Sequence, residues 1–280
     1  MGGGLLSMTN QKATVFRGGG RITAALIAGL RLAGDRRPIV VHDRNPGKVR
    51  ALRREFRVEA ARDLKSALLR AEKLRAEMLI VAVRPGSVAE LLEEVAACGA
   101  GAPKLCVSLA AGIPLKKLRA GLRAGVRWAR AMPSPVCRIG HGLTAVTYER
   151  GVSRADRSPV REFFELVGPV VEIPESRFDA FCATYSPSHG YHALATLAAA
   201  AEAAGLDRKT ALTAGAHALA EAILYWRESG QTLTELLRES ATPGGTAAAT
   251  MDAMKRYGYE EAVAEGLRAG VRRARGNARL

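Results

Sequence analysis

Short apolar runs alternate with amphipathic stretches up to about residue 174 of the chain. Between the runs, stretches such as 24–30 and 87–97 carry apolar residues at helical spacing. Strands that alternate with helices are typical of a doubly wound α/β sheet, in which ligands bind beyond the carboxyl ends of the strands. The pattern predicts such a sheet, with strands at 13–16, 38–41, 77–83, 104–109, 128–133, 142–147 and 169–173. We expect one crevice to be lined by the turns after Phe16, Val41, Val83, Leu109 and Met132.

The pattern changes near residue 174, where the strand-like runs stop and long alanine-rich stretches begin. Helices are predicted at 191–204, 208–228, 233–240, 245–255 and 260–275. Such helices carry few large residues, so we expect one apolar face to be buried against a second copy of the chain. The sequence predicts a Rossmann-type sheet domain over 13–174, an all-helical domain over 175–280 and a loose tail over 1–12, in which Met8 is an alternative start.

The charge of the chain favours anionic partners. Its formal net charge is +15, from 42 Lys and Arg against 27 Asp and Glu. The arginines are spread over the predicted helices, and neither interleaved aromatic residues nor a nucleic-acid-binding motif accompanies them. We therefore expect no nucleic-acid partner, and we expect the positive field to attract anionic small molecules.

The cysteines and the apolar segments narrow the class of protein further. Cys98, Cys106, Cys137 and Cys182 are scattered and lack metal-ligand spacing, which predicts reduced thiols and no metal. No apolar run reaches the roughly 18 to 20 residues of a membrane span, and residues 1–7 lack the pattern of a signal peptide. We expect a cytoplasmic protein that does not enter membranes.

A glycine-rich turn follows the first predicted strand and opens the first predicted helix. Its order, Gly18-x-Gly20-x-x-Thr23, is the dinucleotide-binding fingerprint with a small third residue. Gly18 makes the tight turn, Gly20 admits the pyrophosphate, and Thr23 lets helix and strand pack. Asp43 lies after the second strand, where a carboxylate contacts the ribose.

A second glycine-rich loop, Thr242-Pro243-Gly244-Gly245-Thr246, precedes a small-residue helix. Proline suits a first helical turn, and the glycines let another molecule come close to the backbone. The helix would direct N–H groups at a carboxylate or phosphate. A tight helix–helix turn is the alternative for this motif alone.

Six separated motifs occur in one order and resemble pyrroline-5-carboxylate reductase from about residue 13 to the end. They are the Gly18–Gly20 turn, Val83-Arg84-Pro85, Ala110–Ile113, Arg130–Pro133, Glu175…Asp179-Ala180 and Thr242–Thr246. We identify the chain as a divergent member of this family of NAD(P)H-dependent oxidoreductases. The resemblance implies hydride transfer to the C=N bond of a cyclic imino acid, proline biosynthesis, and a homodimer or larger homo-oligomer formed through the C-terminal helices.

The resemblance also implies two sets of site residues. The cofactor, NADPH or NADH, would be held by Gly18, Gly20, Arg21, Ile22, Asp43, Arg44, Val83, Arg84 and Pro85, with Ala111 and Met132 beside the nicotinamide. The substrate would be bound by Ser186, Ser188, Thr242, Gly244, Gly245, Thr246 and Ala247. Asp43 favours NADH, whereas Arg44, Lys48 and the positive field favour NADPH, toward which we lean.

Departures from the family pattern cluster at the predicted crevice. Ala247 replaces a threonine placed near the imine nitrogen, Arg17 replaces an aliphatic residue, and Arg21 replaces an asparagine. The segment 185–192 is also altered, and Met132-Pro133-Ser134-Pro135 is one residue shorter than its counterpart. Two alternatives therefore stay open, a reductase of another imine or keto substrate and a non-catalytic dinucleotide-binding paralogue.

Proton transfer has few candidates in this sequence. We predict Thr246, Tyr191 and His189 as catalytic residues, with His192 nearby. A capping or packing role at a helix start is the alternative for the 189–192 residues. Hydride transfer to a protonated imine needs little acid–base chemistry, because positioning of the reactants lowers the activation barrier by about 7 to 11 kcal/mol.

Overall fold

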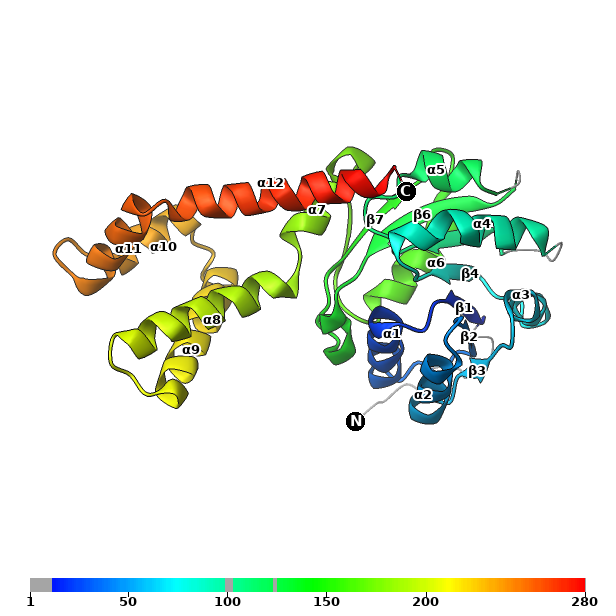
Figure 1. Cartoon of the computed structure of the whole chain (residues 1–280), viewed down its shortest axis with the longest axis horizontal. Coiled ribbons are helices and arrows are strands. Elements are labelled where there is room, and N and C mark those ends of the chain that lie inside the picture. The colour runs from blue at the N-terminus through cyan, green and yellow to red at the C-terminus, as the bar shows by residue number, and fades with distance from the viewer. Residues whose placement is uncertain (1–11, 99–102, 123–124, 280) are drawn as a thin grey trace. The chain divides into compact units, whose positions relative to one another are not determined.

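The computed structural model describes residues 12–98, 103–122 and 125–279, and the chain divides into two compact units (Figure 1). The first unit runs to Tyr185 and takes up the chain again from Gly270, and the second comprises Ser186–Ala269. Apart from Lys12, the tail predicted at residues 1–12 lies outside the described residues.

An eight-stranded sheet forms the centre of the first unit. Its order is β3-β2-β1-β4-β5-β6-β7-β8, and every neighbouring pair is parallel except the antiparallel pair β6–β7. This arrangement confirms the predicted α/β class. The chain runs outward on both sides of β1, which creates the switch point where such sheets bind ligands. The strands are β1 (Thr14–Arg17), β2 (Ile39–His42), β3 (Glu59–Ala60), β4 (Met78–Val81), β5 (Leu105–Ser108), β6 (Arg127–Met132), β7 (Thr144–Tyr148) and β8 (Val170–Glu172).

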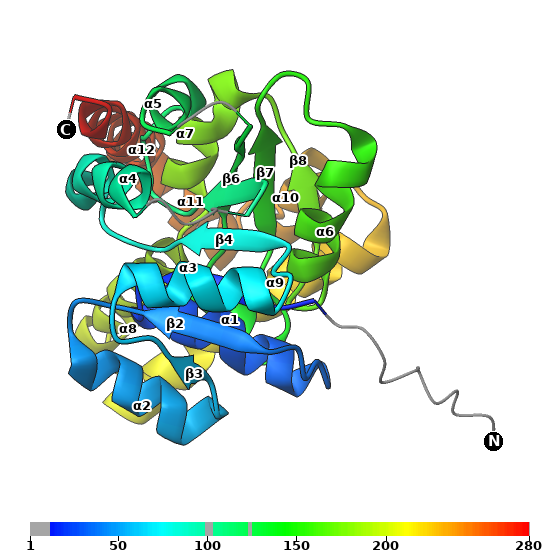
Figure 2. The same ribbon diagram turned by 90° about the vertical axis from the view of Figure 1, so that its right-hand side faces the viewer.

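Helices cover both faces of this sheet (Figure 2). One face carries α1 (Arg21–Leu32), α2 (Pro46–Phe56) and α6 (Arg154–Glu165), and the other carries α3 (Leu64–Lys73), α4 (Val88–Ala97) and α5 (Leu115–Ala120). Alternate residues of each central strand enter opposite cores, as Phe16 and Val15 do on β1. Burial on both faces explains why these strands read as continuous apolar runs. Short 3₁₀ turns occur at Pro85–Ser87 and Pro135–Ile139.

The second unit is entirely helical and has little buried core. It contains α8 (Pro187–Ala203), α9 (Arg208–Ser229), α10 (Leu233–Ser240), α11 (Thr246–Arg256) and the first part of α12 (Tyr259–Asn277). Helices α8 and α9 pack side by side (Figure 1). The buried residues of this unit are the small Ala198, Ala211 and Gly215. No helix in the described part of the chain combines the length and apolar character needed to cross a membrane.

A buried arginine on β6 holds α7 (Glu175–Thr184) to the sheet. The side chain of Arg130 on β6 is 3% exposed, and its guanidinium donates to Glu175 Oε1 at 3.2 Å and to Asp179 Oδ1 at 3.1 Å. It also lies 4.4 Å from the centre of the Phe178 ring. The backbone N–H of Leu115 donates to the same Glu175 oxygen at 2.7 Å. Arg130 thus fixes α7, and Glu175 on that helix in turn holds the start of α5.

We expect Arg130→Met to destabilise the protein by about 3 kcal/mol, because it leaves two partly buried carboxylates without their cation. Urea denaturation at one protein concentration measures this loss. Arg138→Met is the matched control, because Arg138 pairs with Glu55 where both side chains are about half exposed. That loss should stay below about 1 kcal/mol. Equal losses in the two variants would contradict the role given to Arg130.

Candidate functional site

The turn from β1 to α1 can be built only with glycine at its first position. Gly18 has a φ of +113°, and a Cβ there would lie 2.3 Å from the carbonyl oxygen of Ala82. The Thr23 hydroxyl donates to the Gly18 carbonyl at 2.7 Å and so closes the turn. Gly20 is the N-cap of α1, and among the described residues no side chain caps this helix and nothing lies within 4 Å of the place of a Gly20 Cβ. The first N–H groups of α1 therefore have no side-chain partner there, as an anion site requires.

Asp43 ties the end of β2 to this glycine turn. Its Oδ2 accepts from Gly19 N at 2.7 Å, and its Oδ1 accepts from Asn45 N at 2.7 Å. Burial disfavours the charged form, but these two backbone hydrogen bonds outweigh it and lower the pKa of the Asp43 carboxyl. The group is thus a carboxylate at neutral pH, with further lone pairs available for a ribose hydroxyl.

A cavity of about 490 Å³ opens in front of this turn. The turns after β1, β2 and β4 form it, and those after β5 and β6 contribute no lining residue. Five of its lining residues are cations, whereas Asp43 is its one carboxylate. Size, charge and the uncapped helix fit a dinucleotide. The lining residues are Arg17, Gly20, Arg21, Asp43, Arg44, Lys48, Ala82, Val83, Arg84 and Ser87.

The predicted cofactor residues fall into two groups. Six of them line this cavity together, and Gly18 shapes its turn. The other four lie outside the lining: Ile22 packs on the core beneath α1, Pro85 begins the 3₁₀ turn, Ala111 follows β5 and Met132 ends β6. Of these, Ala111 accepts a hydrogen bond through its carbonyl oxygen from Asn277 Nδ2 at 3.1 Å. The roles of all these residues stay predictions.

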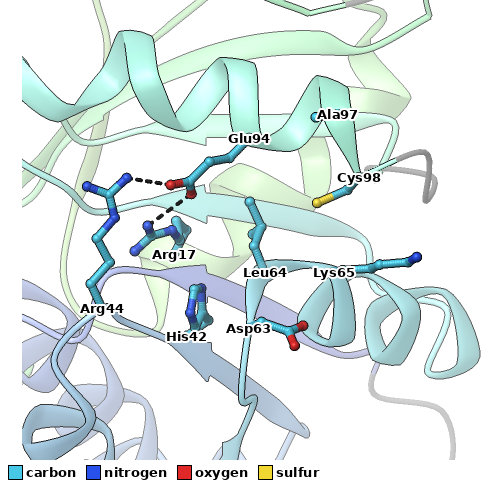
Figure 3. Close-up of a pocket in the computed structure, with 9 residues that line it drawn as sticks. All are labelled: Arg17, His42, Arg44, Asp63, Leu64, Lys65, Glu94, Ala97 and Cys98. Atoms are coloured by element: carbon cyan, nitrogen blue, oxygen red, sulfur yellow. Dashed lines mark hydrogen bonds and ion pairs between the residues drawn. The ribbon is translucent and has the colours of Figure 1, made fainter.

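Arg17 takes part in a charge network that sequence reasoning missed (Figure 3). Its side chain is 4% exposed and donates to Glu94 Oε2 at 3.2 Å. The other Glu94 oxygen pairs with Arg44, which also pairs with Glu90. An adjoining cavity of about 470 Å³ shares Arg17 and Arg44 with the first. The signal available in the sequence was a charged residue at the end of an apolar strand, since a buried cation requires an anionic partner.

The loop at 242–246 has the geometry of an anion-binding helix start. Gly244 has a φ of +80°, and Gly245 N donates to the Thr242 carbonyl at 2.9 Å. Helix α11 begins at Thr246 with Gly245 as its N-cap and no side-chain cap. The predicted place of Pro243 in the first helical turn is wrong, because the turn through Gly244 separates the proline from the helix.

The altered segment at 185–192 forms the start of α8. This helix begins at Pro187 rather than at the predicted residue 191. Ser186 caps it, and its Oγ lies 3.4 Å from Ser188 N and 2.7 Å from Ser188 Oγ. His189 N donates to the Ser186 carbonyl at 3.0 Å, and Tyr191 is 70% exposed. Ser186 thus has a capping role, while the substrate and catalytic roles given to this segment stay predictions.

Two family models match the chain. The model described as pyrroline-5-carboxylate reductase dimerisation matches residues 175–277, and the model described as NADP oxidoreductase coenzyme F420-dependent matches residues 13–112. The dimerisation model covers all of the helical unit. The oxidoreductase model covers the glycine turn and every residue that lines the cavity in front of it.

Known proteins are similar over nearly the whole chain. Pyrroline-5-carboxylate reductase of Mycobacterium tuberculosis is 30% identical over 271 residues, which cover 88% of this chain and 90% of that protein. The enzyme of Escherichia coli is 27% identical and covers 92% of this chain and 95% of its own length.

Solved structures show the same fold. A 1-pyrroline-5-carboxylate reductase of Streptococcus pyogenes has a TM-score of 0.85 at 20% identity, over 95% of this chain and 98% of that one. A Plasmodium falciparum pyrroline carboxylate reductase with NADP bound has a TM-score of 0.83 at 17% identity, over 96% of this chain and 98% of that one. The six motifs and this similarity over nearly the whole chain show that the chain belongs to the pyrroline-5-carboxylate reductase family of NAD(P)H-dependent oxidoreductases.

Proposed function

We propose that this enzyme reduces 1-pyrroline-5-carboxylate to L-proline with NADPH as the preferred hydride donor and NADH as the alternative. The observation that carries the cofactor half is the cationic cavity at the uncapped start of α1. The full-length similarity to proteins named pyrroline-5-carboxylate reductase supports the substrate half. We also propose residues 13–174 as the dinucleotide-binding domain and 175–280 as the substrate and dimerisation domain.

The residues around the glycine turn suit the parts of a dinucleotide. The α1 N–H groups and Arg21, the first residue of α1, would hold the pyrophosphate. Arg21 and Arg84 are the lining cations that form no ion pair within the described residues. Asp43 would accept from a ribose hydroxyl, while Arg44 and Lys48 would face a 2′-phosphate. When bound, the cofactor supplies the hydride to the C=N carbon.

The helical unit would hold the substrate and move a proton. The N–H groups at Gly245 and Thr246 would bind the substrate carboxylate, as the uncapped start of α11 allows. Tyr191, His189 and Thr246 would serve the imine nitrogen. Positioning of the imine against the hydride donor, rather than strong acid–base catalysis, would supply most of the acceleration.

We expect the unmutated enzyme to reduce pyrroline-5-carboxylate slowly and Ala247→Thr to raise the rate about ten- to a hundredfold. The physical reason is one hydrogen bond to a charged group, worth roughly 1.5 to 3 kcal/mol, which Ala247 does not make. Steady-state loss of NADPH absorbance measures the rate.

Ala249→Thr is the matched control for this experiment, because it adds the same hydroxyl to the same exposed helix on a different side. A panel of other cyclic imines and keto acids tests the substrate. Faster reduction of another panel member would favour a reductase of different specificity, and binding of NADPH without any reduction would favour a non-catalytic paralogue.

We expect Gly20→Val to abolish NADPH binding while leaving the protein folded. The chain itself has room for the new side chain, which would occupy the space proposed for the pyrophosphate. Gly18→Ala should instead lower the unfolding temperature, because its Cβ would collide with the Ala82 carbonyl. Fluorescence titration and thermal unfolding of the two variants measure the contrast. Undiminished NADPH binding by Gly20→Val would contradict the assignment of this turn.

We propose that the helical unit forms a homodimer, in line with the dimerisation model that matches it. Ile223, Leu224, Tyr225 and Trp226 are consecutive on α9 and are each between 42% and 59% exposed. Four consecutive residues point to all sides of a helix, so the fold of one copy leaves this apolar turn uncovered. In a homo-oligomer, a second copy of the chain would cover this exposed turn.

We expect light scattering to show a dimer or larger assembly at micromolar concentration, and Ile223→Asp to shift it toward the monomer by burying an unpaired charge in the interface. Leu69→Asp on α3 is the control, since Leu69 is an exposed apolar residue of the first unit. A monomeric unmutated protein would contradict the proposed assembly.

A further inference from the structure

Arg44, the cation that the proposed function places at the 2′-phosphate, is already paired with two carboxylates. Its Nη1 donates to Glu90 Oε2 at 2.7 Å, and its Nη2 pairs with Glu90 Oε1 at 2.7 Å and with Glu94 Oε1. Glu90 and Glu94 lie one turn apart on α4, so they present both carboxylates to the same guanidinium. Both terminal nitrogens of Arg44 are thus engaged within the protein.

Arg17 holds the carboxylate of Glu94 in place. A cation that is 4% exposed must keep an anionic partner, and its Nη2 donates to Glu94 at 3.2 Å. Figure 3 shows Glu94 between Arg17 and Arg44, with each of its carboxylate oxygens directed at one guanidinium. Burial disfavours the charged form of Glu94, but the hydrogen bonds from Arg44 and Arg17 outweigh it and lower the pKa of its carboxyl. Glu94 is therefore a fixed negative charge and not a mobile surface group.

We propose that Glu90 and Glu94 are specificity-determining residues, which neutralise Arg44 and thereby reduce this enzyme's preference for NADPH over NADH. The inference rests on the proposed function, because it assumes that a dinucleotide occupies the cationic cavity. A 2′-phosphate must share Arg44 with two carboxylates of its own sign, and it is repelled by both. A ribose hydroxyl carries no charge and meets no such repulsion, and the Asp43 carboxylate beside Gly19 suits it as an acceptor.

The expected size of the effect follows from Coulomb's law. A carboxylate that shares Arg44 with the phosphate would lie about 6 to 8 Å from it, and in a partly solvated site one such charge is worth roughly a three- to tenfold change in affinity. Salt should reduce it, because Arg44 and Glu90 are each about half exposed. The ratio of the dissociation constants of NADPH and NADH isolates this effect, since the two ligands differ only in the 2′-phosphate.

The test compares the full-length Glu90→Gln, Glu94→Gln and double variants with the unmutated protein. Fluorescence titration gives Kd for NADPH and for NADH at two salt concentrations. We expect the double variant to bind NADPH at least tenfold more tightly at low salt, with Kd for NADH changed less than twofold. Glu93→Gln is the matched control, because Glu93 is an exposed residue of the same helix and removes the same net charge.

Glu90→Gln alone keeps the inference testable if loss of the Glu94 charge unfolds the protein around Arg17. Glu90→Gln should lower the Kd for NADPH about threefold. Glu93→Gln should not change the ratio of the Kd for NADPH to the Kd for NADH. An unchanged ratio in Glu90→Gln and in every Glu94 variant that folds, or equal tightening of both dinucleotides, would overturn the inference while leaving the proposed function intact. Failure of both dinucleotides to bind the unmutated protein would overturn the proposed function, and the inference with it.

Discussion

Buried positive charge at the carboxyl edge of the sheet is the constraint that places the surrounding helices. Arg17 on β1 and Arg130 on β6 are both less than 5% exposed. A buried cation is tolerated only with anionic partners in good geometry. Without them, the free energy lost by removing the charge from water exceeds the free energy gained from packing. Glu94 on α4 meets this need for Arg17, and Glu175 and Asp179 on α7 meet it for Arg130. Both helices are therefore fixed by charge as well as by apolar contacts.

The same constraint shapes the electrostatics of the cationic cavity at the glycine turn. Of its five cations, Arg17 and Arg44 are paired with carboxylates, and Lys48 lies 3.7 Å from Asp43. The formal charge of the lining therefore overstates the field that a ligand meets. In the proposed site, Arg21 and the α1 amides would act together at the glycine turn, so the site would be directed mainly at the pyrophosphate, which every nicotinamide dinucleotide carries.

Local pattern was sufficient to predict the sheet, and its failures have local causes. Strands buried on both faces stand out as apolar runs, whereas β3 has only two residues and includes Glu59, so it has no such signature. The start of α8 was misplaced although Ser186-Pro187 is a strong helix-start signal. The prediction assigned Ser186 and Ser188 to substrate binding, as the family resemblance implies, although Ser186 caps the helix.

The candidate site was predictable as far as its residues lie in short motifs or at strand ends. Gly20 and Arg21 were predicted from the glycine turn, Asp43 from its place after the second strand and Arg84 from the 83–85 motif, and the structure brings all four to one cavity. Glu94 was missed because it lies 77 residues from Arg17 and belongs to an acidic helix that resembles a solvated face. Only the fold reveals which carboxylate a buried arginine selects.

The two units differ most in how they obtain stability. Both apolar cores belong to the first unit, whereas the second buries only Ala198, Ala211 and Gly215. Burial of so few small side chains contributes little favourable free energy. It offsets only a small part of the conformational entropy that the helices of that unit lose on folding. The exposed apolar turn at 223–226 would be the surface through which the proposed association supplies the remainder. Folding of the helical unit would then be coupled to assembly, and its stability should depend on protein concentration in a way that the stability of the sheet does not.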